Sequence, residues 1–313
     1  MSTISVPAVD AEIQSLLETT DAGVFPFYGL DAVLSSSELY ARLRERPDTT
    51  FDGRAEVNDV FIPGPGGQLR LRVYRPATDH DLPVILYLHG GAFTYGSPEA
   101  EEDHALRYAL DADAVVVSVD YRLAPEHPYP AAADDAYTAL TWVAEHADRI
   151  GGDPQRIAVA GVSAGGNIAA STVLRARDRG GPKVVFQLLL YPALDSSMTS
   201  SSVREFTDTP VLNRGAVEVA WRYYAAGRAP YASPAHATDL SGLPPAFVVA
   251  AEADPLRDED RRYAERLSEA GVTTELIQVP GAVHGFDLLF PKARVSRRNL
   301  EDQVRALREA LHP

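Results

Sequence analysis

The chain has 313 residues, enough for one large α/β domain that carries an added subdomain. Hydrophobic residues make up 45% and charged residues 23%, a balance that is typical of globular proteins and argues against disorder. The formal charge of -15 repels nucleic acids and anionic membrane surfaces, and the absence of cysteine excludes disulfides, a thiolate nucleophile and cysteine-ligated metals.

The first segment, residues 1–50, lies outside the strand and helix pattern of the later chain, and we expect it to form the N-terminal part of a cap. Its start, MSTISVPAVD, has neither the basic residues nor the long apolar core of a secretory signal. The strongest apolar run, Val184 to Leu190, is far shorter than the roughly 18 residues that span a bilayer. We therefore expect a cytoplasmic protein without stable membrane insertion.

Two strands are predicted next, at Ala55 to Ile62 and Gln68 to Tyr74. They flank the sequence GPGG at 64–67, whose glycines allow the positive φ angles of a tight reversal. The two strands should pair antiparallel at one edge of a sheet.

From Leu82 onward, short apolar runs alternate with longer segments of helical character. This alternation indicates crossover connections, and therefore a mostly parallel sheet flanked by helices. The continuous apolar character of most runs is typical of strands buried on both faces. The predicted strands are 84–88, 115–119, 157–160, 184–190, 247–250 and 274–279; the predicted helices are 101–110, 131–147, 164–177, 257–270, with Gly271 as its stop, and 296–311.

One further segment, residues 194–239, interrupts the alternation after Tyr191 and Pro192. We interpret it as the second segment of the cap. The α/β core is then predicted to comprise residues 51–193 and 240–313.

The first motif with chemical content is HGGAF at 89–93, where two consecutive glycines follow a predicted buried strand. The N–H groups of Gly90 and Gly91, together with that of Ala164, could stabilise the oxyanion that forms when a carbonyl is attacked. A plain glycine turn is the alternative for this motif alone.

The second motif is GVSAG at 161–165, placed between a predicted strand and a predicted helix. In this context Ser163 would occupy a sharp turn that exposes its hydroxyl. A side chain at Gly161 or Gly165 would collide with neighbouring backbone at such a turn. Ser163 is therefore the candidate nucleophile.

A serine nucleophile needs a base and a group that orients the base. His284 follows a predicted strand in the loop PGAVHGF, and Asp254 ends AEAD after another strand, so the order is serine, aspartate, histidine. Asp258, Asp287 and Asp195 are rival acids. The other histidines considered, His80, His146 and His236, fit surface or structural positions.

Together these motifs resemble the hormone-sensitive-lipase-like family of α/β hydrolases. The resemblance covers most of the chain from about Leu82 and includes HGGAF, VDYRLAPEHPYPAAADDAY, GGDPQRIAVAG, GVSAGG, LLLYP, ADPLRDE and HGF. It implies an α/β-hydrolase fold with a helical cap, the catalytic groups Ser163, Asp254 and His284, and the oxyanion donors Gly90, Gly91 and Ala164. Val162 and Ala92 depart from the residues that are frequent in the family, and Val162 removes a side-chain hydrogen-bonding group beside the nucleophile.

A substrate pocket is expected beneath the cap, and Phe93, Tyr95, Leu212, Trp221 and Tyr224 are the candidates to line it. Packing within the cap is the alternative for these side chains. Tyr121, Arg122, Pro125 and Glu126 are expected to brace the oxyanion loop rather than contact substrate.

The predicted function is hydrolysis of short- to medium-chain esters through an acyl-enzyme, with no metal or organic cofactor. An amidase, lactonase or peptidase with the same catalytic groups is the alternative within enzymes. A non-catalytic receptor for a small ligand is another, although His284 is present and related plant hormone receptors have lost this histidine. The expected partner is a small ester rather than a nucleic acid, and a homodimer is left open.

Overall fold

The structure is a computed structural model that describes residues 7–19, 53–224, 229 and 231–313. Its strands are β1 (Ala55–Gly64), β2 (Gly67–Pro76), β3 (Leu82–Leu88), β4 (Val115–Val119), β5 (Gly152–Val162), β6 (Phe186–Leu190), β7 (Ala246–Ala253) and β8 (Thr274–Val283). Its α-helices are α1 (Ala11–Thr19), α3 (Glu102–Asp111), α4 (Ala131–His146), α5 (Ala164–Asp178), α6 (Ser201–Glu205), α7 (Arg214–Tyr224), α8 (Arg257–Glu269), α9 (Phe286–Leu289) and α10 (Arg294–Leu311). Three short 3-10 helices are η2 (Pro98–Glu101), η3 (Ala147–Ile150) and η4 (Pro234–His236).

The strands form one 8-stranded sheet in the order β1-β2-β4-β3-β5-β6-β7-β8. Strand β2 runs antiparallel to both β1 and β4, and the strands from β4 to β8 pair in parallel. The predicted antiparallel edge is confirmed, with Gly67 at a φ of 121° in the turn between β1 and β2. The predicted α/β class with a mostly parallel sheet is also confirmed.

The predicted strands and helices are all present, and their ends are where the sequence was least informative. Strand β5 begins at Gly152 because this residue pairs with Leu82 on β3, ahead of the apolar run that starts at Ile157. Strand β8 continues to Val283 through a bulge, because Ala253 on β7 pairs with it. These strand ends are set by pairing with strands that are far away in the sequence. The apolar pattern of the segment itself therefore does not predict them.

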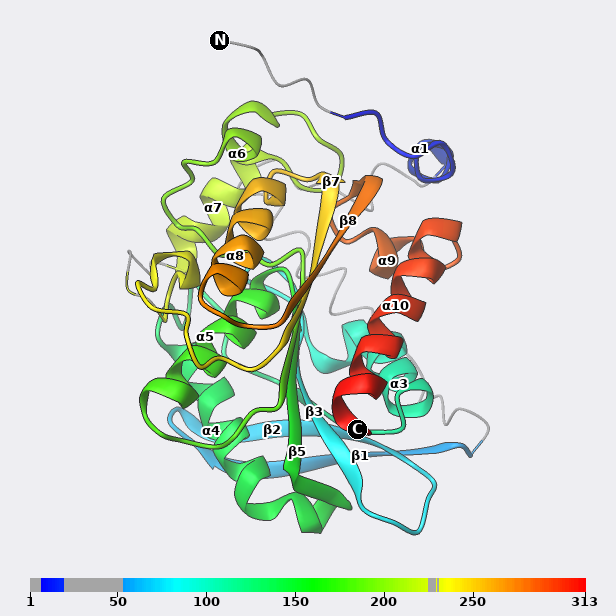
Figure 1. The fold of residues 1–313 in the computed structure, drawn as a ribbon, viewed down its shortest axis with the longest axis vertical. Coiled ribbons are helices and arrows are strands. Elements are labelled where there is room, and N and C mark those ends of the chain that lie inside the picture. Colours follow the sequence, from blue (N-terminus) through cyan, green and yellow to red (C-terminus); the bar gives the residue numbers. More distant parts are fainter. Residues whose placement is uncertain (1–6, 20–52, 225–228, 230) are drawn as a thin grey trace.

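Each face of the sheet packs against a layer of helices (Figure 1). Helices α4, α5 and α8 cover one face, and α3, α9 and α10 cover the other. Consecutive residues of β3 face opposite sides of the sheet. Leu86 packs in the core beneath α4, α5 and α8, and Tyr87 packs in the core beneath α3, α9 and α10. The central strands β3, β4 and β6 are therefore buried on both faces, and the ends of the strands can position a site.

Of the predicted cap, residues 1–6 and 20–52 lie outside the described residues, and α1 is the only regular element described before β1. The second cap segment, 194–239, contains α6, α7 and η4. Figure 1 places α6 and α7 at the end of the sheet toward which β7 and β8 run. The division into core and cap stays a prediction.

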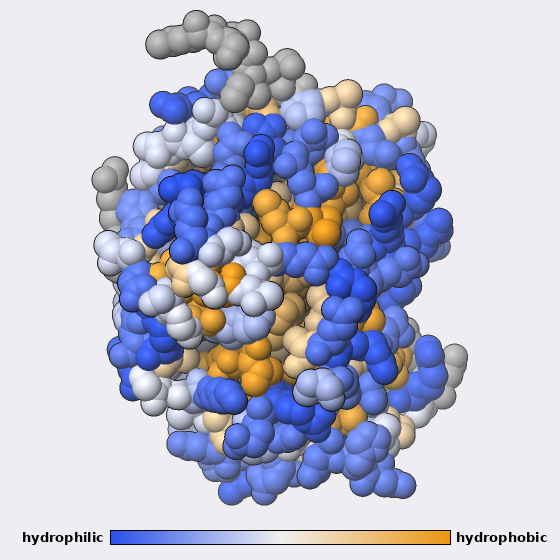
Figure 2. Space-filling model, in the orientation of Figure 1, coloured by the Kyte–Doolittle hydropathy of each residue, from blue (hydrophilic) through white to orange (hydrophobic). Residues whose placement is uncertain are grey.

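The surface seen in Figure 2 is mainly hydrophilic, with several smaller apolar areas between the charged side chains. Phe61, with 55% of its surface exposed, is the large hydrophobic side chain that stands out among the described residues. Within the described ranges, none of the helices has both the length and the apolarity needed to cross a membrane.

Candidate active site

Ser163 lies at the sharp turn between β5 and α5. Its backbone has φ 54° and ψ -117°, a conformation that is strained for a residue with a side chain. A Cβ at Gly161 would collide with the carbonyl oxygen of Gly165, and a Cβ at Gly165 would collide with the carbonyl oxygens of Leu88 and His89. The predicted steric need for both glycines is therefore confirmed.

His284 lies between Ser163 and Asp254. Its Nε2 is 2.8 Å from Ser163 Oγ, and its Nδ1 is 2.6 Å from Asp254 Oδ2. Asp254 is fully buried, and its Oδ1 also accepts the Leu256 N–H over 2.9 Å. With an ionised Asp254, Nδ1 carries the proton and Nε2 is left to accept the proton of Ser163. The structure thus brings the three predicted side chains together in the order needed for proton transfer.

The rival acids have other partners. Asp258 bonds to Arg257 and to the Ser202 N–H near the start of α8. Asp195 accepts from His236 over 2.8 Å. Asp287 accepts from the Tyr191 hydroxyl over 2.5 Å and from two amide side chains of α10. None of these carboxylates is recorded in a bond with His284, so Asp254 is the acid that the geometry favours.

The oxyanion loop, which we define as residues 89–93, contradicts one prediction. The Gly90 N–H donates to Oε1 of Glu101 over 2.7 Å, so this amide is already engaged. The physical reason is the inward position of the Glu101 carboxylate, which draws the Gly90 peptide toward η2. The local sequence HGGAF gives no sign of that carboxylate, and Gly90 is therefore not a donor to substrate in this conformation.

Three other amides surround Ser163. Gly91 and Ala92 line a cavity of about 80 Å³ together with Ser163 and His284, and Ala92 and Ala164 line a second cavity of about 20 Å³ that also reaches Ser163. In the described part of the chain, no acceptor takes up the N–H of Gly91, Ala92 or Ala164. The predicted candidates Gly91 and Ala164 thus keep free amides at the site. The N–H of Ala92 is a further free amide at the site. Its position directly after Gly91 in the sequence could have indicated it.

The predicted pocket side chains divide between the two cavities. Tyr95 and Leu212 line the larger one, and Phe93, Leu212 and Trp221 line the smaller one. Leu212 therefore lines both cavities, as do Ala92 and Ser163. It comes from the predicted second cap segment, just before α7.

Tyr224 does not line either of these two cavities. Its ring stacks flat against Phe93, with centroids 3.9 Å apart and an interplanar angle of 7°. On helix α7, Trp221 lines the smaller cavity, whereas Tyr224 packs behind Phe93. For Tyr224, the packing alternative is therefore the one that the structure favours.

Tyr191, at the end of β6, was not among the predicted site residues. Its ring packs edge-on against His284, with centroids 4.9 Å apart, and its hydroxyl donates to Asp287. Burial raises the pKa of Tyr191 well above its usual value, so its hydroxyl stays neutral. The motif LLLYP contained the residue, but only the fold brings it to the histidine.

A family model described as alpha/beta hydrolase fold matches residues 85–288, which contain Ser163, Asp254 and His284. The chain belongs to the α/β-hydrolase fold family. The match spans well over half of this α/β hydrolase and includes both cavities and most of their walls.

The hydrolase is 42% identical to the carboxylesterase NlhH of Mycobacterium tuberculosis, over 99% of this chain and 98% of that protein. Among solved structures, a bacterial heroin esterase matches with a TM-score of 0.90 and 36% identity, covering 99% of this chain and 100% of that one. The esterase LipW from Mycobacterium marinum matches with a TM-score of 0.87 and 39% identity, covering 98% and 99%. The predicted resemblance to hormone-sensitive-lipase-like esterases is confirmed by these relatives.

Proposed function

We propose that this α/β hydrolase is a serine carboxylesterase in which Ser163, His284 and Asp254 hydrolyse short- to medium-chain esters. The observation that carries the proposal is the position of His284, within hydrogen-bond distance of Ser163 on one side and Asp254 on the other. The named esterases among its relatives support an ester as the substrate class.

In the first half of the reaction, Ser163 Oγ attacks the ester carbonyl while His284 Nε2 takes the hydroxyl proton. The carbonyl oxygen becomes an anion, for which the N–H groups of Gly91, Ala92 and Ala164 are the proposed donors. Collapse of this intermediate releases the alcohol, which leaves with the proton from His284. Asp254 stabilises the imidazolium that exists in between.

In the second half, water attacks the acyl-enzyme and His284 accepts one of its protons. The same amides stabilise the second tetrahedral anion. Its collapse returns the proton to Ser163 and releases the carboxylic acid. The chain's own groups supply every proton transfer in this scheme.

The cavities favour small substituents on the ester. The smaller cavity, about 20 Å³, has room for on the order of one or two non-hydrogen atoms, and Trp221 and Leu212 limit it. The larger, about 80 Å³, accepts a somewhat longer group. We therefore expect an ester with an acetyl-sized group on one side to be preferred over one with a palmitoyl chain.

The test compares the wild type with Ser163→Ala on p-nitrophenyl acetate, butyrate, octanoate and palmitate. We expect turnover to be highest with acetate or butyrate, and to fall by about a thousandfold or more in the variant, because the nucleophile is lost. Ser171→Ala is the matched control, since Ser171 lies on the same helix and its hydroxyl bonds to the Tyr231 carbonyl instead. Equal rates for wild type and Ser163→Ala on every ester would overturn the proposal.

Parallel assays with p-nitroacetanilide and a γ-lactone separate the ester proposal from the amidase and lactonase alternatives. Acyl-transfer groups alone do not choose between these substrates, because selectivity arises from contacts to the leaving group. Faster turnover of the anilide or lactone than of every ester would reassign the substrate class while leaving Ser163 as nucleophile.

A further inference from the structure

A buried carboxylate that the proposed mechanism does not use lies against the oxyanion loop. Glu101, at the end of η2, is 6% exposed and lines the same cavity as Ser163. Its Oε1 accepts the Gly90 N–H over 2.7 Å, and its Oε2 accepts the Tyr87 hydroxyl over 2.6 Å. Both oxygens are thus engaged, one of them with the loop.

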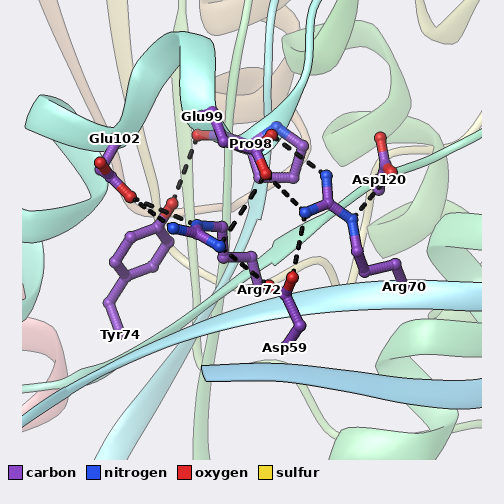
Figure 3. A network of polar contacts seen from close by, with 8 residues as sticks. All are labelled: Asp59, Arg70, Arg72, Tyr74, Pro98, Glu99, Glu102 and Asp120. Atoms are coloured by element: carbon purple, nitrogen blue, oxygen red, sulfur yellow. Dashed lines mark hydrogen bonds and ion pairs between the residues drawn. The ribbon is translucent and has the colours of Figure 1, made fainter. Parts of the chain in front are cut away.

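The neighbours of Glu101 in the acidic run 99–102 explain why it points inward. Figure 3 shows Arg70 and Arg72 of β2 bound to Glu99 and Glu102. The Tyr74 hydroxyl donates to the Pro98 carbonyl over 3.3 Å (Figure 3). With its flanking residues tied to β2, η2 turns Glu101 toward the oxyanion loop.

Two contacts, one to each of the two peptide groups that meet at Gly90, together set where the next amide points. The Gly90 carbonyl lies 2.7 Å from His89 Nδ1, so both polar groups of Gly90 have partners. Because a peptide group is planar and trans, the N–H of Gly91 points away from the carbonyl of Gly90. The contact with His89 thus orients the peptide that carries the Gly91 N–H, one of the free amides beside Ser163, and the bond to Glu101 fixes the peptide that precedes it.

We propose that Glu101 is a positioning residue for ester hydrolysis, whose carboxylate holds the Gly90 amide and thereby directs the Gly91 N–H toward the substrate oxyanion. This inference rests on the proposed esterase function and adds a group that acts through the loop rather than on the substrate. A charge-assisted hydrogen bond is about twice as strong as a neutral one, so the ionised form of Glu101 holds the loop best.

The surroundings make this ionisation relevant near neutral pH. Burial raises the pKa of Glu101 to about 7, even though the Tyr87 hydroxyl, the Gly90 N–H and the nearby His104 favour the charged form. The titratable groups that face it are Tyr87 from β3, His104 and Tyr108 from α3, Tyr191 after β6 and Asp287 from α9. Protonation of Glu101 should then add an ionisation to the acid limb of the activity profile.

The first variant is Glu101→Gln, which keeps the shape of the side chain and an oxygen for the Gly90 N–H but removes the charge. We expect kcat on p-nitrophenyl butyrate at pH 8 to fall about tenfold with little change in KM, because the loop acts on the transition state. The acid limb of kcat/KM should show two ionisations in the wild type and one in the variant. A merely structural role would lower activity without removing an ionisation.

The second variant is Tyr87→Phe, which removes the hydroxyl that favours ionised Glu101. Its expected effect is to move the Glu101 ionisation to higher pH. Tyr263→Phe is the matched control. Tyr263 is a buried tyrosine of α8 whose hydroxyl has no hydrogen-bond partner within the described ranges, and its loss should leave the profile unchanged.

Thermal denaturation and active-site titration with a fluorophosphonate establish that each variant is folded and retains Ser163. A kcat in Glu101→Gln equal to or above that of wild type, or a single ionisation in every enzyme, overturns the role of Glu101. If this happens while Ser163→Ala remains inactive, the esterase function stands and only the positioning role fails. If Glu101→Gln does not fold, the Tyr87→Phe profile still decides, because an unmoved acid limb contradicts the proposal.

Discussion

Gly91 and Ala92 differ in what a side chain would cost, although they are neighbours in the oxyanion loop. Gly91 has a φ of 120°, and a Cβ there would collide with the carbonyl oxygen of Tyr95. Ala92 already carries a Cβ at a φ of 50°, in the left-handed region that other residues visit at a modest cost. The loop therefore requires glycine at position 91 and only prefers it at position 92.

A pair of variants tests this difference. Gly91→Ala should lower kcat by about a hundredfold or more, since moving the loop removes at least one oxyanion donor. Ala92→Gly relieves the backbone strain and keeps the N–H, so its kcat should stay within a few fold of wild type. The measurement is kcat on p-nitrophenyl acetate, with thermal denaturation as the check on folding. Similar losses of kcat in both variants would mean that any substitution in the loop lowers activity and that the Gly91 amide has no special role.

The residues of the candidate site could be predicted to different extents. Ser163, Asp254 and His284 each follow a strand, so their residue types and their positions in the sequence indicate a shared site. Gly90 could not be assigned correctly, because the direction of its N–H depends on Glu101, which the sequence presents as one of several acids at a helix start. Tyr191 was missed because its contact with His284 joins two distant parts of the chain.

At the scale of elements, the segment after β4 is attached to α4 by an ion pair between the partly exposed Arg122 and the buried Asp135. Arg122 donates from Nε and from a terminal nitrogen to the two oxygens of Asp135, at 2.8 and 2.9 Å, and its backbone N–H donates to the same carboxylate. The adjacent Tyr121 stacks on His89 and donates to its carbonyl oxygen over 2.7 Å. The expectation that this segment braces the oxyanion loop thus has a structural basis.

Removing the cation should be costly because Asp135 is almost completely buried. Arg122→Met is expected to lower the free energy of unfolding by about 3 kcal/mol, since it leaves an unpaired carboxylate in the protein interior. Adding Asp135→Leu should recover part of that loss, because an apolar pair replaces the buried charge. Urea unfolding of the single and double variants measures both effects.

The matched control is Arg222→Met on α7. Arg222 pairs with Glu218, but their side chains are 69% and 55% exposed, so the loss should be within about 0.5 kcal/mol. If Arg122→Met were as mild as this control, the segment after β4 would be held by packing rather than by the ion pair.

At the scale of the whole molecule, the alternation of apolar runs and helical segments predicted the covered sheet. The apolar residues of β3 pack in two cores, as expected for a strand buried on both faces. The order in which the strands lie side by side was not predicted. It depends on crossover connections and pairings between distant segments, such as β3 with β5, which leave no local mark in the sequence.

The free energy of folding should also depend on a carboxylate that the sequence does not distinguish from its neighbours. Asp260, on α8, is fully buried, and neither of its oxygens has a hydrogen-bond partner in the part of the chain that is described. Burial raises the pKa of Asp260 well above its usual value, and Glu259, Asp254 and Asp258 raise it further. The folded protein therefore keeps a proton on Asp260 that the unfolded chain releases above about pH 4.

The sign of the effect follows from this difference. Because the folded state binds the extra proton, the contribution of Asp260 to stability is present at low pH and is lost as the pH rises toward its folded pKa. Asp260→Asn removes the ionisable group. Between about pH 4 and the folded pKa of Asp260, the free energy of unfolding of the variant should therefore rise relative to that of wild type by about 1.4 kcal/mol for each unit of increasing pH. Urea unfolding at pH 5, 6, 7 and 8 gives the slope directly. Asp148→Asn, at an exposed position, should show no such slope. A constant difference between Asp260→Asn and wild type at all four pH values would mean that Asp260 is ionised in the folded protein and has a partner that offsets its burial.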